Sequence, residues 1–184
     1  GISMKTDEEL TQLASLGVGI AYMGLESGDD QVLADIRKGA GSDKMIRMGK
    51  RVKQAGIKLS VTVLVGLAGK ERSLIHAKET GRVLSEIDPD YVGALSLMLI
   101  PGTELHADHE AGRFDLPSAE EMLAELGQMI ASTHLTDGLF HANHASNYLP
   151  IRARLPRDKE RTLDQIAQAL SGKIKLKPEF MRAL

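Results

Sequence analysis

The sequence predicts an α/β protein with parallel strands, arranged as half of a barrel or as a small open sheet. Three apolar segments of strand length end in polar or small residues: Tyr22 to Gly28, Val61 to Glu71 and Ala94 to Thr103. Helical patterns lie between them, and this alternation is typical of right-handed crossovers in a parallel sheet. Because parallel architectures gather their chemistry where strands end, the three polar ends indicate one shared site.

The first repeat is a helix, a strand and two further helices. Thr6 and Glu9 form a capping-box pattern, which predicts a helix over residues 6–16. Residues 18–25 are apolar on both alternating faces, which predicts a strand covered on both sides. The two further helices are expected over residues 29–38 and 42–55.

The same unit recurs twice. Asp88 and Pro89 end the helix of the second repeat, and Ser118 with Glu121 forms a second capping box. The expected strands are 59–65 and 91–99, and the expected helices are 72–87, a short one after Thr103, and 118–132.

The C-terminal part has a different pattern. Residues 138–150 are polar and aperiodic, a helix is expected over 158–170, and Pro178 begins a short one. We therefore expect a β/α unit over residues 1–133 and a mostly helical extension, 134–184, packed on it.

The composition narrows the classes of function. The chain has 184 residues, a formal net charge of -2, 3% aromatic residues and no cysteine. These values argue against nucleic acid and membrane partners, and no apolar run approaches the ~20 residues of a membrane span. Gly1 to Met4 lacks signal-peptide features and reads as an expression scar or an internal cut, so we expect a cytoplasmic protein.

Glu26 and Ser27 stand where the first strand ends. A carboxylate there can accept hydrogen bonds from two ribose hydroxyls, and a serine can add a third; a solvated strand end is the alternative. Arg37 and Lys38 follow, either to clamp a carboxylate or simply as cations at a helix C-terminus.

The segment from Val65 through Gly66 and Leu67 to Gly69 is a turn between a strand and a helix. Glycine lets a backbone approach a ligand closely, so its N–H and C=O groups could read an adenine edge; plain turn chemistry explains the glycines equally well. The phosphate-binding G-x-x-x-x-G-K-[ST] pattern is not found here. Thr62 either points into a barrel interior or fills the strand as a β-branched residue.

Two histidine pairs and one polar loop complete the candidates. The pairs His106/His109 and His141/His144 have a spacing that zinc sites use, but surface or loop histidines fit better. Asn147 and Tyr148 lie in a dense polar loop that either faces a substrate or satisfies itself.

Together these segments resemble the radical S-adenosylmethionine (radical SAM) enzymes over roughly residues 6–105. The resemblance rests on three stretches in family order: Gly24 to Gly39, Val65 to Glu71 and Pro101 to Leu105. The tail, His144 to Pro150 and Leu155 to Lys159, looks like that of relatives of oxygen-independent coproporphyrinogen III oxidase, or generic Fe–S oxidoreductases. The resemblance implies a half of a partial TIM-type barrel, with strands equivalent to the fourth to sixth.

Carried over by position, the resemblance implies cofactor contacts. Glu26 and Ser27 would meet the ribose of S-adenosylmethionine, Lys38 its methionine carboxylate, and the backbone from Val65 to Gly69 its adenine. Relatives often have proline where Ala68 stands, which leaves the backbone role intact.

The largest departure from the family is the lack of cysteine, because the family holds its 4Fe–4S cluster with a C-x-x-x-C-x-x-C loop. The resemblance therefore implies the C-terminal part of an enzyme whose N-terminal half is a missing partner. The parent would form a 5′-deoxyadenosyl radical that abstracts hydrogen from an unidentified substrate, while the isolated chain would be inactive.

Two alternatives remain open. The chain could be a non-redox half-barrel that binds a nucleotide or serves as an interaction module, or a β/α enzyme that uses a phosphate substrate and a histidine-held metal. A truncated barrel exposes the edge of its first remaining strand, so we expect self-association or capping of that edge by the C-terminal segment.

Overall fold

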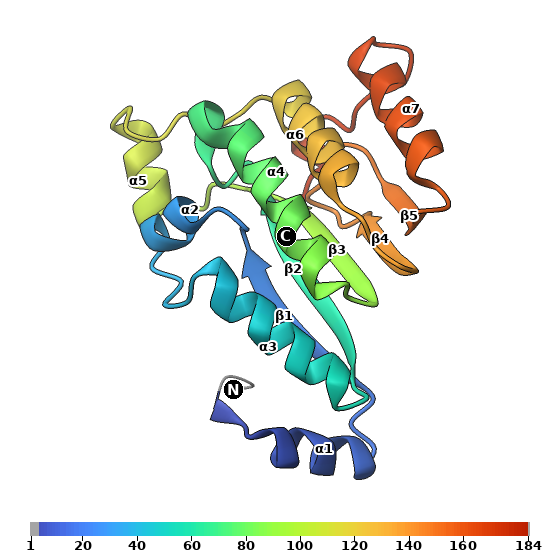
Figure 1. The fold of residues 1–184 in the computed structure, drawn as a ribbon. Coiled ribbons are helices and arrows are strands. Elements are labelled where there is room, and N and C mark those ends of the chain that lie inside the picture. The colour runs from blue at the N-terminus through green and yellow to red at the C-terminus, as the bar shows by residue number, and fades with distance from the viewer. Residues whose placement is uncertain (1–3, 184) are drawn as a thin grey trace.

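A computed structural model describes residues 4–183, so residues 1–3 of the segment interpreted as an expression scar or an internal cut lie outside the described part. Five strands form one sheet in the order β1-β2-β3-β4-β5 (Figure 1). The first three pairs are parallel and β4 pairs with β5 antiparallel, which confirms the predicted α/β class with a mostly parallel sheet. The strands are β1 Ile20–Glu26, β2 Lys58–Val65, β3 Tyr91–Ser96, β4 Gly138–Ala142 and β5 Ile151–Leu155.

The helices follow the predicted punctuation closely. Both capping boxes form, at Thr6 before α1 and at Ser118 before α6. The helix after β2 begins at Gly69, three residues earlier than expected. The helices are α1 Asp7–Ser15, α2 Asp30–Asp35, α3 Ser42–Gln54, α4 Gly69–Ile87, α5 Glu104–Glu110, α6 Ala119–Ser132 and α7 Lys159–Leu170, followed by a 3-10 turn at Glu179–Met181.

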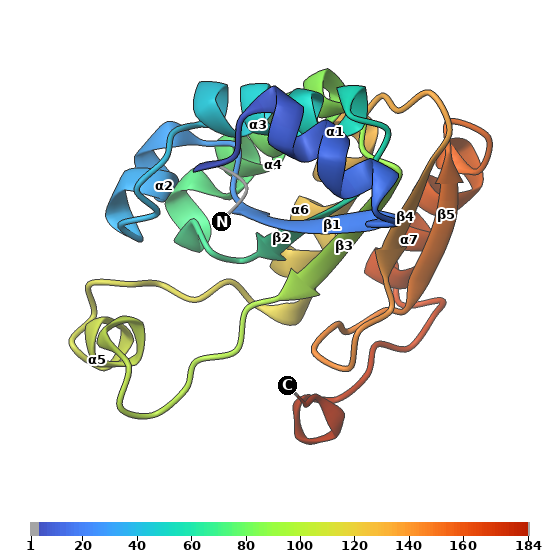
Figure 2. The ribbon, with the colours of Figure 1, turned by 90° about the horizontal axis from the view of Figure 1, so that it is seen from below.

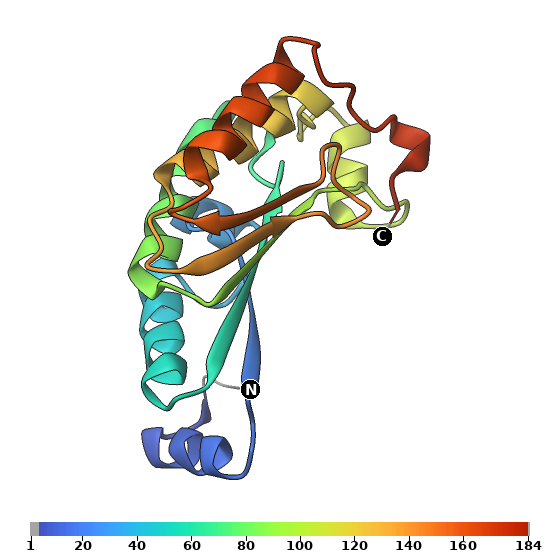
Figure 3. The same cartoon turned by 90° about the vertical axis from the view of Figure 1, so that its right-hand side faces the viewer.

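Helices cover one face of the sheet. Figures 2 and 3 show α3, α4, α6 and α7 on the same side of the strands, where the hydrophobic core lies. Along β2, every second residue from Leu59 to Val65 is buried, and the residues between them are only half-buried or exposed. The face opposite these helices is called the open face below.

The prediction that residues 18–25 form a strand covered on both sides is wrong. The side chain of Tyr22 is 73% exposed, and Ile20 is 38% exposed. Their neighbours Met23 and Leu25 are buried. No helix among residues 4–183 covers the open face, so the apolar residues that alternate onto it stay accessible (Figure 2).

The prediction that residues 138–150 lack periodic structure is also wrong, because β4 lies within them and β5 follows directly. Each strand is only five residues long, and β4 is flanked by polar residues. Pairing with the sheet makes this segment a strand, because β4 is hydrogen-bonded to β3 and Phe140 is fully buried. Conversely, β3 ends at Ser96 rather than at residue 99. The proposed division after residue 133 falls between α6 and β4.

Candidate functional site

The end of β1 brings together two of the predicted site residues. Lys38 Nζ lies 3.0 Å from Glu26 Oε1, and both side chains are half-buried. The chain between Glu26 and Lys38 forms α2 and its C-terminal turn. This turn brings Lys38 back to the end of β1. An ion pair sheltered in this way holds both groups in one orientation.

The backbone beneath this pair is specialised. Glu26 has φ +66°, a left-handed conformation that is uncommon for a residue other than glycine, and the register of β1 against β2 shifts between Gly24 and Glu26. A Cβ at Gly24 would lie 2.3 Å from Glu26 Oε1 and 3.3 Å from Lys38 Nζ. The ion pair therefore lies over Gly24 on the open face, and a side chain at this position would have to displace it. Bulges and left-handed residues of this kind gather at functional sites.

Ser27, the next predicted residue, faces the interior. Its side chain is fully buried, and its Oγ lies 2.8 Å from His76 Nδ1 and accepts from Asp29 N–H at 2.9 Å. His76 Nε2 lies 3.1 Å from the Leu64 carbonyl, which can only accept, so Nε2 carries the proton and Nδ1 accepts from Ser27. Burial lowers the pKa of His76 to about 4, which keeps this neutral tautomer. A contact between Ser27 and ribose stays a prediction.

Glu125 continues the buried network to the end of β2. Its Oε1 accepts from Gly66 N–H at 2.7 Å, and its Oε2 lies 2.5 Å from Ser73 Oγ. His76 Nε2 is 3.4 Å from Oε1. Burial raises the pKa of Glu125 to about 7, against hydrogen bonds from Ser73 and Gly66 that lower it. The carboxyl group therefore keeps its proton until the pH approaches neutrality.

The network joins the two strand ends that carry the candidate site. It runs from Ser27 through His76 and Glu125 to Gly66, with every contact inside the core of β1, β2, α4 and α6. Sequence reasoning missed His76 and Glu125. The available signal was a polar residue at core-facing helix positions, since Glu125 lies on the apolar face that also presents Met122 and Met129.

The turn after β2 leaves some of its backbone groups open. The Val65 carbonyl accepts from Leu97 N–H, and the Gly66 carbonyl accepts from Gly69 N–H. Gly66 has φ +87° and Gly69 φ +64°, so both glycines adopt conformations that the turn requires. Within residues 4–183, the N–H groups of Leu67 and Ala68 have no acceptor.

A hollow of ≈ 330 Å³ lies against this turn, between α2 and α5. Leu67 and Ala68 line it together with the apolar side chains of Val32 and Phe114. Arg72 borders it and forms a bidentate pair with the buried Asp29 at 2.8–3.0 Å, which ties α4 to the start of α2.

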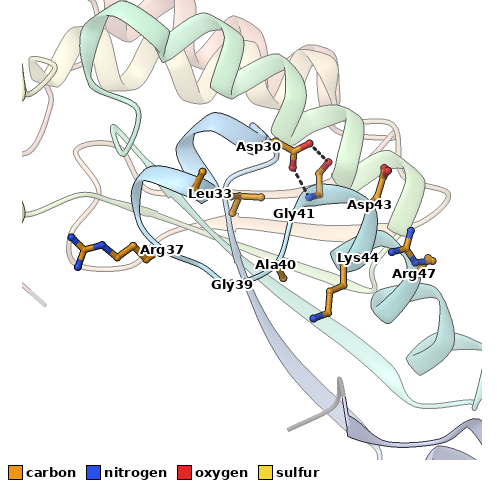
Figure 4. Close-up of a pocket in the computed structure, with 11 residues that line it drawn as sticks. Asp30, Leu33, Arg37, Gly39, Ala40, Gly41, Asp43, Lys44 and Arg47 are labelled. Atoms are coloured by element: carbon orange, nitrogen blue, oxygen red, sulfur yellow. Dashed lines mark hydrogen bonds between the residues drawn. The ribbon is translucent and has the colours of Figure 1, made fainter.

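A hollow of ≈ 600 Å³ lies on the outside, between α2 and α3 (Figure 4). Its polar centre is occupied: Asp30 accepts from the Ser42 N–H at 2.6 Å and from the Ser42 hydroxyl at 3.1 Å. Figure 4 shows Arg37, Lys44 and Arg47 pointing apart. This hollow therefore offers no convergent set of groups.

Asn147 and Tyr148, the predicted substrate residues, are buried and have internal partners. Asn147 accepts from Ser96 Oγ at 2.9 Å and donates to the Ala94 carbonyl at 2.9 Å. Tyr148 donates to Glu179 at 2.6 Å, and the Arg182 guanidinium lies 4.1 Å from its ring centroid. These contacts bind the loop after β4 to β3 and to the C-terminal tail, and a contact with substrate stays a prediction.

The histidine pairs contact single neighbours, and His106 Nδ1 lies 3.6 Å from Glu110 Oε2. His109 Nδ1 lies 2.9 Å from the Phe114 carbonyl, and His144 Nδ1 lies 3.0 Å from Ser146 Oγ. Residues 4–183 contain no group of three or more His, Asp or Glu side chains that could hold a metal ion. In the same range no helix combines the length and apolar character that crossing a membrane needs.

Comparison with solved structures identifies similar folds. Archaeal Methanocaldococcus infernus Elp3 with residues 1–46 deleted superposes with a TM-score of 0.59 at 17% identity, covering 91% of this chain and 39% of that chain. Methylornithine synthase (PylB) gives a TM-score of 0.49 at 21% identity, covering 71% of this chain and 37% of that one. Both are radical SAM superfamily members. No protein-family profile and no curated protein sequence matches the chain.

The likeness to Elp3 confirms the predicted fold class, a partial radical SAM barrel-like α/β fold. The chain spans about two fifths of the length of the Elp3 chain. At this level of identity the likeness concerns the fold alone.

Proposed function

We propose that this chain is the C-terminal part of a radical SAM enzyme and supplies the ribose, carboxylate and adenine contacts for S-adenosylmethionine. One observation carries the proposal: the Glu26–Lys38 ion pair at the end of β1, placed over Gly24 on the open face. Carboxylate and ammonium groups presented together suit a ligand with vicinal hydroxyls and an amino-acid carboxylate. The unpaired N–H groups of Leu67 and Ala68, at the end of the adjacent strand, suit an adenine edge.

The residues fit the two family cofactors unequally. The strand ends offer S-adenosylmethionine both charge and backbone donors, whereas the sequence contains no cysteine to hold a 4Fe–4S cluster. In the whole enzyme the cluster would supply the electron for cleaving the cofactor, and its ligands would lie in another part of the protein. The role proposed for this chain is therefore to bind and orient. Membership of the coproporphyrinogen-oxidase-like subgroup belongs to the same proposal.

The buried network gives the proposed site its rigidity. Glu26 precedes Ser27, and Leu67 follows Gly66, so the chain from Ser27 through His76 and Glu125 to Gly66 holds the ribose and adenine sides at one separation. In this proposal His76 and Glu125 are positioning residues.

The partner proposed for the chain is the preceding part of the same protein. Among the described residues β1 is an edge strand, and the open face carries exposed apolar side chains such as Tyr22. Strands added to that edge would continue the barrel and cover the face. Self-association through the same edge is the competing outcome, and analytical ultracentrifugation of the chain alone would distinguish a dimer from a monomer.

Calorimetric titration with S-adenosylhomocysteine and with adenosine tests the function. We expect S-adenosylhomocysteine to bind the chain and Lys38→Met to weaken it about tenfold, because a charge-assisted contact to the carboxylate is lost. Adenosine has no carboxylate, so Lys38→Met should weaken its binding less than that of S-adenosylhomocysteine, and only by loosening Glu26. Glu26→Gln should weaken both ligands, and Lys44→Met, in the outer hollow, should change neither.

A non-redox nucleotide-binding module is the second candidate, favoured by the lack of cysteine. It predicts equal affinity for adenosine and S-adenosylhomocysteine and no effect of Lys38→Met. Failure of both ligands to bind the folded chain would contradict either function.

A further inference from the structure

A single row of residues crosses the open face from β1 to β5. The strand register places Gly24 beside Thr62, Thr62 beside Gly93, Gly93 beside His141, and His141 beside Arg152. Their neighbours along each strand are buried toward the helices, so these residues face the other way. The row begins under the Glu26–Lys38 pair and ends at an arginine.

Arg152 is oriented but not neutralised. With its amide oxygen turned toward the guanidinium, Asn143 accepts from both Nε and one Nη of Arg152 at 3.1 Å. No carboxylate of residues 4–183 lies within 4.0 Å of this guanidinium. Arg154, the next residue of β5 on the same face, is by contrast paired with Asp137 at 2.8 Å. Arg152 therefore keeps donors free for an anion in a fixed direction.

His141 stands opposite Arg152 and adds a second donor. Burial, followed by the charge of Arg152, lowers the pKa of His141, so the neutral ring presents one N–H group. Beside it, a Cβ built on Gly93 would meet no atom within 4 Å. The surface of the sheet at Gly93, next to Arg152 and His141, is therefore unobstructed. Thr62, which carries a hydroxyl group, lies on the other side of Gly93.

We propose that Arg152 and His141 form a subsite for the carboxylate or phosphate group of a small substrate that lies across Gly93. A planar guanidinium with unused donors matches either anion, and Asn143 holds it in place. Gly24 and His141 are three strand spacings apart, roughly 14 Å across the sheet. That separation leaves room for the body of a small molecule between this subsite and the Glu26–Lys38 pair.

This subsite adds the chemical class of the substrate to the proposed function, and its anion is a substrate group only if the proposed function holds. Anion binding at Arg152 can nevertheless be measured by itself. The chain would be titrated with inorganic phosphate and, separately, with succinate, while NMR follows the His141 ring and the Arg152 Nε–H.

We expect saturable shifts of both resonances with at least one probe. Saturation by phosphate alone indicates a phosphorylated substrate, and saturation by succinate alone indicates a carboxylate. Arg152→Gln should weaken the binding about tenfold or more, whereas Arg154→Gln, on the same strand and face, should leave it unchanged. Asn143→Ala keeps the charge but frees the guanidinium, so an intermediate loss is expected, which covers the case in which Arg152→Gln fails to fold.

Shifts that do not saturate with either probe, or equal affinity in a folded Arg152→Gln variant, would overturn the subsite. S-adenosylhomocysteine separates the two proposals: its binding should be unaffected by Arg152→Gln. Anion binding without S-adenosylhomocysteine binding keeps the subsite and removes the proposed function, and the reverse result keeps the function and removes the subsite.

Discussion

Replacing Glu125 by Gln tests the buried network most directly. Glutamine has the same shape, so its carbonyl oxygen can accept from Gly66 N–H and its NH₂ group can donate to Ser73 Oγ. The change removes only the capacity to ionise. The pKa of Glu125 is raised in the folded protein from 4.5 to about 7, which corresponds to about 3 kcal/mol.

The sign follows from proton linkage. The folded state holds the proton on Glu125 more tightly than the unfolded state, so this group's contribution to stability is complete below about pH 4.5 and is lost as the pH rises to about 7. Glu125→Gln should therefore be more stable than the wild type by only about 1 kcal/mol at pH 5. At pH 8 the variant should be more stable by about 3 kcal/mol. The pKa of His76 is lowered in the folded state, so protonation of His76 destabilises both proteins as the pH falls. This effect is common to the variant and the wild type and drops out of the difference between them.

Urea unfolding at pH 5 and pH 8 measures the difference. Glu121→Gln is the matched control, because Glu121 lies one turn earlier on α6 in the exposed capping box. The pKa of Glu121 is lowered, mainly by the hydrogen bond from Ser118 N–H. Replacing this carboxylate by an amide should therefore destabilise the protein modestly at pH 8 and less at pH 5. If Glu125→Gln and the wild type have equal free energies of unfolding at both pH values, Glu125 is not a buried carboxyl group that keeps its proton in the folded state.

Three further substitutions have expected effects on urea unfolding. Gly28→Ala should destabilise by about 2 kcal/mol or more, since its Cβ would lie 2.4 Å from the Glu79 carbonyl oxygen, while Gly93→Ala, with open space, should stay within about 0.5 kcal/mol of wild type. Arg72→Ala should lower the free energy of unfolding by about 2 kcal/mol, because it leaves Asp29 buried without its partner. Arg82→Ala removes only exposed ion pairs on a helix and should lower it by under about 0.5 kcal/mol. Equal losses in the two variants would contradict this account. Arg182→Met should cost about 2 kcal/mol and speed proteolysis of the tail, because the carbonyls of Ser146 and Leu97 lose their donor; an unchanged cleavage rate would show that other contacts hold the tail.

Local signals explain what could be predicted. Thr6 and Ser118 mark helix starts because their side chains bond to backbone groups three residues away, and Gly66 marks a turn because of its own φ angle. The resemblance to a family assigned Glu26 and Lys38 to different groups of one cofactor, and it did not predict that the two side chains form an ion pair. The geometric basis of this pair, a shift of register and the clearance over Gly24, is not visible in the residues themselves.

The α/β alternation, the helix caps and the polar strand ends are legible in the residues alone, because each depends on contacts between near neighbours. The assignment of β4 and β5 as strands comes from the folded sheet, since five-residue segments gain their stability from pairing, β4 with β3 and β5 with β4, rather than from their own periodicity. The folded structure also places His76 and Glu125 between Ser27 and Gly66. These four residues lie on separate elements, and the packing of α4 and α6 against the sheet brings them together.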